Sequence, residues 1–279
     1  MASAGETTLS SEAGELTLNL ETTIKFVKLC ASKFGWEDLS EATVMDLGCG
    51  KDLNCARTVL EDFPNVKSII ALDGNREQLD EITFKSDKII HLLADIRHRR
   101  EIRQYEGKID KIISTHVLHQ IPSKERVFRN VYRLLKSGGE AAFLFTSDLG
   151  IYHVLESLQM DDKYKDYFKG SDITELYSSK IKSDDYREML GRLGFEVIEI
   201  TETKDHMSVE HFGLFENTLF KFVAAAFSVP SELVTEINEA ASHLYLTKFC
   251  EQSSIYASTE MSIFVKKPSE LPSDSCSNS

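Results

Sequence analysis

The first residues that could do chemistry are two glycines that follow an acidic residue. Thr43–Leu47 is largely apolar apart from Asp46, and Gly48 and Gly50 come next, before a stretch with helical spacing. Glycines here would let the backbone turn tightly and approach a ligand that a Cβ would exclude. A dinucleotide-binding turn needs a third glycine, but Leu53 stands at that position. A carboxylate at Asp46 instead favours a cationic ligand group.

Two more acidic residues follow the next two apolar runs. Asp73 ends the run Val66–Leu72, where a carboxylate can accept hydrogen bonds from both hydroxyls of a ribose. The same residue could instead cap the helix that follows. Asp95 and Ile96 follow the third run, and we expect Asp95 to accept a hydrogen bond from an adenine amine while Ile96 packs against the ring. The order of these residues predicts a nucleoside site.

The fourth apolar run, Lys111–Ser114, leads into polar side chains. In a doubly wound sheet the fourth strand lies beside the first, and ligands bind where the strand order reverses. We therefore expect Ser114, Thr115 and His116 to face the ligand. His116 and His119 could each act as a general base if the reaction needs one. A histidine at a strand end can also be an ordinary hydrogen-bonding residue, and that alternative stays open.

Short apolar runs alternate with amphipathic stretches, which is typical of a parallel sheet with crossover helices. Most runs are continuously apolar, as expected for strands covered on both faces. The predicted strands are Thr43–Leu47, Val66–Leu72, Lys88–Leu92, Lys111–Ser114, Glu140–Phe145, Phe195–Thr201 and Glu260–Val265. The predicted helices include Thr22–Phe34, Asn54–Asp62, Arg76–Ile82, Ser123–Leu135 and Asp184–Leu193. The pattern predicts an α/β fold with a doubly wound sheet of seven strands.

The chain is expected to form a single domain over residues 16–267. Residues 1–15 and 268–279 are small and polar, and we expect them to be a flexible N-terminus and a disordered tail. Two aromatic-rich segments, 149–182 and 206–250, interrupt the alternation, and the second is a helical insertion before the last strand. They could form the roof of a substrate pocket or an extra helical layer that closes the core.

Composition excludes several classes of function. The 45 acidic residues exceed the 32 basic ones, giving a formal charge of −13, which disfavours nucleic acid as a partner. No apolar run approaches the ~20 residues of a membrane span, and the N-terminus has no signal-peptide pattern. The five cysteines have no metal-ligand spacing, so we predict free thiols, no metal site and a cytoplasmic location. The oligomeric state stays open.

The motifs, taken in this order, resemble those of the class I S-adenosylmethionine-dependent methyltransferases. They are D-L-G-C-G at 46–50, Asp73 after the second strand, Ala94-Asp95-Ile96 and the fourth-strand motif. The resemblance implies a Rossmann-like fold and S-adenosylmethionine as the cofactor. It also implies cofactor binding by Asp46, Gly48, Gly50, Asp73, Asp95 and Ile96, to which the strand-end argument adds Ser114.

A narrower resemblance points to a substrate. Thr115–His119 and the helix at 125–135 resemble the insect juvenile hormone acid methyltransferases. That family methylates a terpenoid carboxylate, such as farnesoic acid or juvenile hormone acid. A carboxylate is already ionised at neutral pH, so its methylation needs alignment and exclusion of water rather than a base.

The sequence departs from that family at three positions. Asp52 replaces a turn glycine, Gln120 replaces a tryptophan, and Asn19 is the nearest match to a glutamine that helps to hold the substrate carboxylate. His116, Gln120 and Asn19 are therefore candidate substrate residues. Two alternatives remain: a methyltransferase-like protein that binds cofactor but has another acceptor or no catalysis, and a nicotinamide-dependent oxidoreductase, which the missing third glycine disfavours.

Overall fold

A mixed sheet forms the body of the protein. The computed structural model describes residues 6–121, 123–169 and 181–269, with side chains from residue 20 onward. Seven strands follow the order β3-β2-β1-β4-β5-β8-β6, and a short strand, β7, pairs with β8. Their bounds are β1 Thr43–Leu47, β2 Ser68–Asp73, β3 Ile89–Leu93, β4 Ile109–Thr115, β5 Leu135–Leu149, β6 Glu196–Ser208, β7 Cys250–Glu251 and β8 Ser254–Lys266.

The strand order confirms the predicted doubly wound fold. β1 to β5 run parallel, because each connection returns the chain to the same end of the sheet. β8 lies antiparallel between β5 and β6. The predicted count of seven strands omitted β7, which has only two residues and no apolar run to reveal it.

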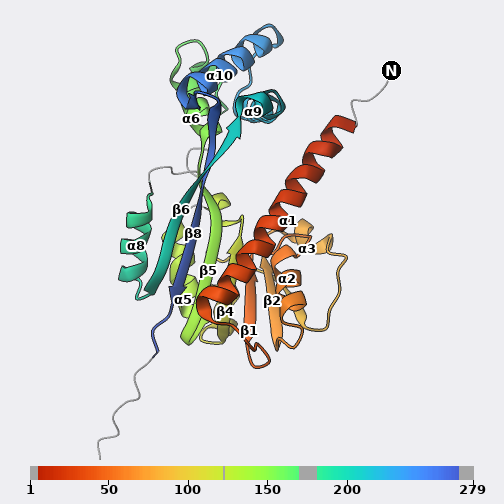
Figure 1. Cartoon of the computed structure of the whole chain (residues 1–279), viewed down its shortest axis with the longest axis vertical. Helices are drawn as coiled ribbons and strands as arrows, with labels where there is room; N and C mark the ends of the chain where they lie inside the picture. The colour runs from red at the N-terminus through yellow and green to blue at the C-terminus, as the bar shows by residue number, and fades with distance from the viewer. Residues whose placement is uncertain (1–5, 122, 170–180, 270–279) are drawn as a thin grey trace, which may run out of the picture.

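Helices cover both faces of the sheet (Figure 1). On one face α1 (Glu6–Phe34), α2 (Asn54–Asp62) and α3 (Arg76–Asp80) pack into one buried cluster. On the other, α4 (Arg99–Ile102), α5 (Lys124–Leu134) and α8 (Ser183–Arg192) pack into a second. α2 matches its prediction residue for residue. α1 begins at Glu6, well before the predicted Thr22, so its helix starts inside the stretch 1–15.

Three strands are much longer than predicted. The sequence indicated Glu140–Phe145, Phe195–Thr201 and Glu260–Val265, whereas β5, β6 and β8 each span 13 to 15 residues. Their outer ends leave the helix-covered part of the sheet. Most of β6 is exposed or half-buried, so its residues are polar and no apolar run marks its true extent.

The long strands carry a second layer of helices, here called the cap (Figure 1). It consists of α6 (Gly150–Met160), α9 (Phe212–Ala226) and α10 (Val234–Phe249), which share a core of their own. The helical insertion before the last long strand is thereby confirmed. Tyr152, Tyr164, Phe212 and Phe227 are buried in this core and do not line an open pocket. Tyr177 lies outside the described residues, as does most of the predicted tail.

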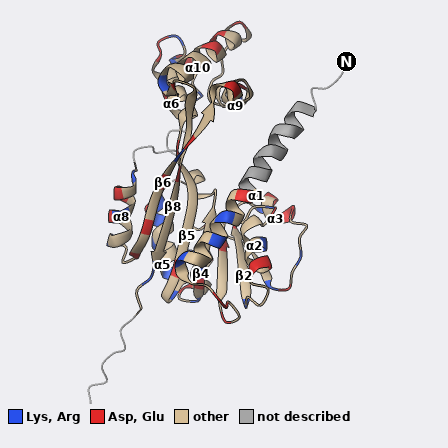
Figure 2. Ribbon diagram, viewed as in Figure 1, with Lys and Arg blue, Asp and Glu red and all other residues tan. Residues whose placement is uncertain are grey.

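Charged residues of both signs are interspersed over the body and the cap (Figure 2). Within the described part of the chain, no helix combines the length and apolar character that a bilayer crossing requires. The same residues hold no cluster of three or more His, Cys, Asp or Glu side chains placed to bind a metal ion.

Candidate functional site

The predicted motifs meet at the carboxyl ends of β1, β2 and β4, around a cavity of about 550 Å³. This volume lies within the usual range for a small-molecule site. Gly48 and Gly50 line the cavity with left-handed backbone, at φ +79° and +57°. A Cβ on Gly48 would lie 2.3 Å from Val117, whereas one on Gly50 would meet only Gln78 at 3.8 Å. Packing therefore requires glycine at position 48, and Gly50 leaves a cradle open toward the cavity.

Asp46 lies behind the glycine turn and is buried. Its Oδ2 accepts a hydrogen bond from the backbone N–H of Ala56 in α2 at 2.9 Å. Burial raises the pKa of this carboxyl to about 7, and the charge of Asp73 adds to the effect. Asp46 also lines a smaller cavity of about 150 Å³, which shares Gly48 and His116 with the larger one. A cationic group in that smaller cavity would favour the ionised carboxylate.

Asp73 ends β2 and ties two loops together. Its Oδ2 accepts from the N–H of Gly50 at 2.9 Å, and its Oδ1 accepts from that of Asn75 at 2.8 Å. The alternative of a helix cap is wrong for Asp73, because Asn75 caps α3 by accepting from Glu77. The half-buried carboxylate lines the cavity and keeps free lone pairs for further donors.

Asp95 and Ile96 form the next part of the wall, after β3. The Arg97 guanidinium donates to both oxygens of Asp95, at 2.7 to 3.0 Å. Burial raises the pKa of Asp95, but the Arg97 hydrogen bonds outweigh burial and lower it overall. The buried Ile96 is fixed through its carbonyl, which accepts from Asn130 at 2.7 Å. Sequence reasoning missed Arg97, which had only a short basic run as its signal.

Ser114 is not brought to the cavity. It is buried, and its hydroxyl donates to the carbonyl of Leu47 at 2.8 Å. The bond joins the end of β4 to the end of β1, beside the glycine turn. Ser114 therefore supports the cavity wall from behind, and its side chain is not positioned to contact a ligand as expected.

His116 lies where the two cavities meet. Its backbone is left-handed, at φ +58°, a conformation that costs a non-glycine residue about 1–3 kcal/mol. Its Nε2 lies 3.0 Å from the hydroxyl of Thr22 in α1, and the neighbouring Thr23 donates to Thr115 at 3.2 Å. α1 thus reaches the site through two adjacent threonines. Sequence reasoning missed both, since isolated threonines in a helix carry no spacing signal.

His119 and Gln120, which follow His116 in the chain, are two further candidates. Burial lowers the pKa of His116, and burial together with the charges of His116 and Lys124 lowers that of His119 to about 4. Both imidazoles are therefore neutral at neutral pH. The exposed Gln120 lines the cavity and donates to the carbonyl of His116 at 3.3 Å. The side chain of Asn19 lies outside the described residues.

Comparison with known proteins identifies a family. The pattern that defines a methyltransferase domain matches residues 23–200. Juvenile hormone acid O-methyltransferase of Bombyx mori is 23% identical over 180 residues, which cover 61% of this chain and 62% of that protein. Arsenite methyltransferase of Halobacterium salinarum is 28% identical over 163 residues, covering 57% of this chain and 38% of that protein. The chain thus spans less than two thirds of the length of these relatives.

Solved structures share the fold. A putative sarcosine dimethylglycine methyltransferase from Galdieria sulphuraria superimposes with a TM-score of 0.58 at 17% identity, covering 90% of this chain and 87% of that one. A putative methyltransferase from Bacillus halodurans gives a TM-score of 0.56 at 16% identity, covering 88% and 99%. At these identities the likeness concerns the arrangement of strands and helices alone.

Proposed function

The chain belongs to the methyltransferase domain family, and we propose that it is an S-adenosylmethionine-dependent methyltransferase whose acceptor is a small carboxylic acid with an apolar body, such as a terpenoid acid like farnesoic acid. One observation carries this proposal. The cavity wall at the end of β4 presents neutral hydrogen-bonding groups from Thr115, His116 and Gln120, next to a groove that has an apolar side. An anionic acceptor that needs no base fits such a wall.

The cofactor fits the larger cavity together with its smaller neighbour. In this proposal the carboxylate of Asp73 accepts from the ribose and the wall at Asp95 and Ile96 takes the adenine, which their positions in the larger cavity support. The buried Asp46, in the smaller cavity, would face the amino group of the methionine end. The open side of Gly50 leaves room that a Cβ would take. When bound, the cofactor supplies an electrophilic methyl group on its sulfonium.

The groove that could take the acceptor's apolar body lies between α1 and the sheet. It has a volume of about 250 Å³. Phe26, Leu29 and Leu144 form its apolar side, and its polar lining consists of Thr22, Lys25, Thr203, Glu260 and Ser262. Thr22 joins it to the site, since the hydroxyl of Thr22 contacts His116. The carboxylate would then lie beside His116. Alignment of such an acceptor and exclusion of water can lower a barrier by about 7–11 kcal/mol.

The thiols beside the cavity argue against arsenite as the acceptor. Trivalent arsenic is a soft centre, and soft centres favour thiolate ligands. Cys49 and Cys55 line the smaller cavity, but burial raises the pKa of both thiols far above neutrality. Protonated thiols are poor ligands. The hormone-acid relative also matches a larger share of its own length than the arsenite relative does.

Titration calorimetry with S-adenosylhomocysteine, followed by a labelled-methyl assay, tests the proposal. We expect transfer to farnesoic acid and none to farnesol, which has the same apolar body without the carboxylate. Arsenite serves as a third acceptor. Binding of S-adenosylhomocysteine without transfer to any lipophilic acid would refute the carboxylic-acid proposal. It would favour the alternative of another acceptor or no catalysis, which Gln120 and Asp52 motivate.

A further inference from the structure

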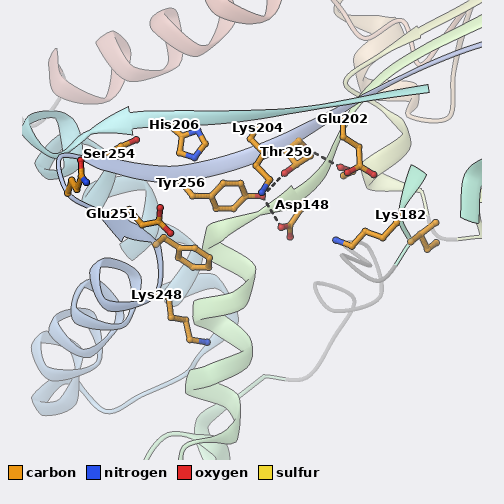
Figure 3. A pocket seen from close by; sticks show the side chains of 14 residues that line it. Asp148, Lys182, Glu202, Lys204, His206, Lys248, Glu251, Ser254, Tyr256 and Thr259 are labelled. Atoms are coloured by element: carbon orange, nitrogen blue, oxygen red, sulfur yellow. Dashed lines mark hydrogen bonds between the residues drawn. The ribbon is translucent and has the colours of Figure 1, made fainter. Parts of the chain in front are cut away.

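A second cavity, larger than the cofactor cavity, lies beside the cap. This cap cavity has a volume of about 650 Å³ and lies between the outer ends of β5, β6 and β8 and the end of α10 (Figure 3). None of its described lining residues lines the cofactor cavity. The methyl-transfer chemistry described above makes no use of it.

Three lysines from three different segments line the cap cavity: Lys182 before α8, Lys204 in β6 and Lys248 in α10. Among the described residues, none of them has a carboxylate within ion-pair distance. Lys248 donates to the Ser157 hydroxyl and the His153 carbonyl, and neither partner cancels its charge. Figure 3 shows Lys182 and Lys204 both reaching toward Asp148. Three lysines that form no ion pair with a described residue thus gather in one cavity, and the charge of Lys182 helps to lower the pKa of Asp148.

The cavity is also lined by three carboxylates, Asp148, Glu202 and Glu251, so the described lining holds as many acidic residues as lysines. Two of them are engaged by other groups. Asp148 lies 2.8 Å from His153 and accepts from the Tyr256 hydroxyl at 2.8 Å, while Glu202 accepts from the N–H of Ser183 at 2.7 Å. The remaining carboxylate, Glu251, is exposed in β7. His153, whose pKa is raised by its hydrogen bond to Asp148, offsets part of the charge of Asp148. Glu202 and Glu251 keep their negative charge, so an anionic ligand would have to lie nearer the lysines than these two carboxylates.

Four hydroxyl groups complete the lining. Tyr256 donates to Asp148 and lies 2.9 Å from the hydroxyl of Thr259, and Ser147 donates to the carbonyl of Thr259. The exposed Ser254 adds a fourth hydroxyl. A phosphate group carries up to two charges and three terminal oxygens, each of which accepts hydrogen bonds. Lysine ammonium groups on separate segments can approach such a group from several directions as point charges. The ring of Phe249 adds an apolar surface for an organic body.

We propose that the cap cavity is a second ligand site, which binds the phosphate group of a small phosphorylated molecule through Lys182, Lys204 and Lys248. The site goes beyond the proposed methyl transfer and does not depend on the identity of the acceptor. A ligand bound there contacts the outer strands, α10 and the start of α8 at once, and so joins the cap to the body.

Calorimetric titration of the full chain with glycerol 3-phosphate, at constant ionic strength, tests this site. We expect binding that weakens roughly tenfold in Lys204→Ala and in Lys182→Ala, the size expected for a lost hydrogen bond to a charged group. Lys85→Ala, which removes an exposed lysine outside the cavity, should leave the affinity unchanged. Glu251→Gln should tighten binding about threefold, because it removes a like charge at an exposed rim.

Succinate and inorganic phosphate distinguish the ligand chemistry. Binding of succinate as tight as that of glycerol 3-phosphate would overturn the phosphate assignment. Failure of glycerol 3-phosphate and inorganic phosphate to bind would overturn the site itself. So would equal losses of affinity in Lys85→Ala and Lys204→Ala, since the effect would then reflect net charge. Unfolding midpoints without ligand show that each variant is folded before its affinity is compared.

Discussion

The two halves of the sheet encode their structure in different ways. In the parallel half, β1 to β4, each strand ends in or just before a residue that lines one cavity: Gly48, Asp73, Asp95 and His116. In the antiparallel half, β5, β6 and β8 continue beyond the helix layers and carry the cap. Chemistry in the first half is local to strand ends, whereas the second half gathers its charged residues from segments far apart in the chain.

This difference between the two halves predicts where a substitution should strongly affect binding or stability. In the parallel half, Gly48 and Asp73 are held by their backbone contacts and would also contact the proposed cofactor. In the antiparallel half, β6 is exposed or half-buried along its length. We therefore expect the effect of a substitution to decrease from the glycine turn outward.

The largest effect is expected for Gly48→Val. The variant would force a branched side chain into left-handed backbone and against Val117, where even a Cβ would lie at 2.3 Å. We expect loss of binding of S-adenosylhomocysteine by calorimetry, with a lowered unfolding midpoint. Gly191→Val in α8 is the matched control, because nothing lies within 4 Å of a Cβ there. A Gly48→Val enzyme with normal affinity would contradict the geometry of the turn.

Asp73→Ala should have the second-largest effect on cofactor binding. It removes an acceptor for the ribose and two hydrogen bonds that hold Gly50 and Asn75. Hydrogen bonds to a charged group are worth about 1.5–3 kcal/mol each, so affinity for S-adenosylhomocysteine should fall on the order of 10- to 100-fold. Asp87→Ala, an exposed acid in the loop before β3, should have no effect. Equal affinity of the Asp73→Ala and Asp87→Ala variants would refute the ribose assignment.

A third test concerns pH. The pKa of Asp46 in the folded chain is about 7, above its ordinary value of 3.8, so the folded state holds this proton more tightly than the unfolded state does. The resulting stabilisation is present at low pH and is lost as pH rises toward and through about 7. Without cofactor, the free energy of unfolding should therefore fall between about pH 4 and 7 through this group and change little through it at higher pH.

Asp46→Asn isolates that contribution. An amide oxygen can still accept from Ala56, but it cannot ionise, so the variant should show a flatter pH dependence than the wild type. Its affinity for S-adenosylhomocysteine should fall, since the negative charge that would face the amino group is gone. Chemical denaturation at several pH values measures the first effect, and calorimetry the second. If the free energies of unfolding of the wild type and of Asp46→Asn changed with pH in the same way, Asp46 would not titrate in this range.

The contrast between the parallel and antiparallel halves also explains which parts of the structure could be predicted from the sequence. Thr43–Leu47 and Asn54–Asp62 match their predicted bounds, because a buried strand and an amphipathic helix each carry a local pattern. Asp73 and Asp95 were found at the cavity because they follow such strands. Ser114 could not be assigned, since whether a strand-end side chain faces the ligand or its neighbouring strand depends on register.

Long-range contacts account for the rest. Thr22 reaches His116 across 94 positions of sequence, and no periodicity of α1 marks it for that contact. The outer parts of β5 and β6 each pair with β8 and are exposed or half-buried, so backbone hydrogen bonds rather than apolar runs define them. The aromatic residues of the cap were visible in the sequence, but only the packing shows that they form a core.

The smallest effect is expected where the two halves meet, at Thr22. Its hydroxyl lies 3.0 Å from Nε2 of His116, whose left-handed backbone already places the ring at the junction of the two cavities. Thr22→Val keeps the shape of the side chain but removes that hydrogen bond, worth about 0.5–1.5 kcal/mol. The imidazole would lose its fixed orientation, so kcat should fall by a few-fold, with the affinity for S-adenosylhomocysteine unchanged.

Thr22→Ser separates this positioning role from packing, because it keeps the hydroxyl and loses the methyl group. If Thr22 acts by orienting His116, the serine variant retains kcat and the valine variant does not. A merely structural role would give the reverse order, because the methyl group packs beside the apolar groove and the hydroxyl would be dispensable. The ratio of the two kcat values therefore measures how much the hydroxyl of Thr22 contributes to the reaction. It thereby tests whether α1 is part of the site, although no motif connects α1 to the glycine turn.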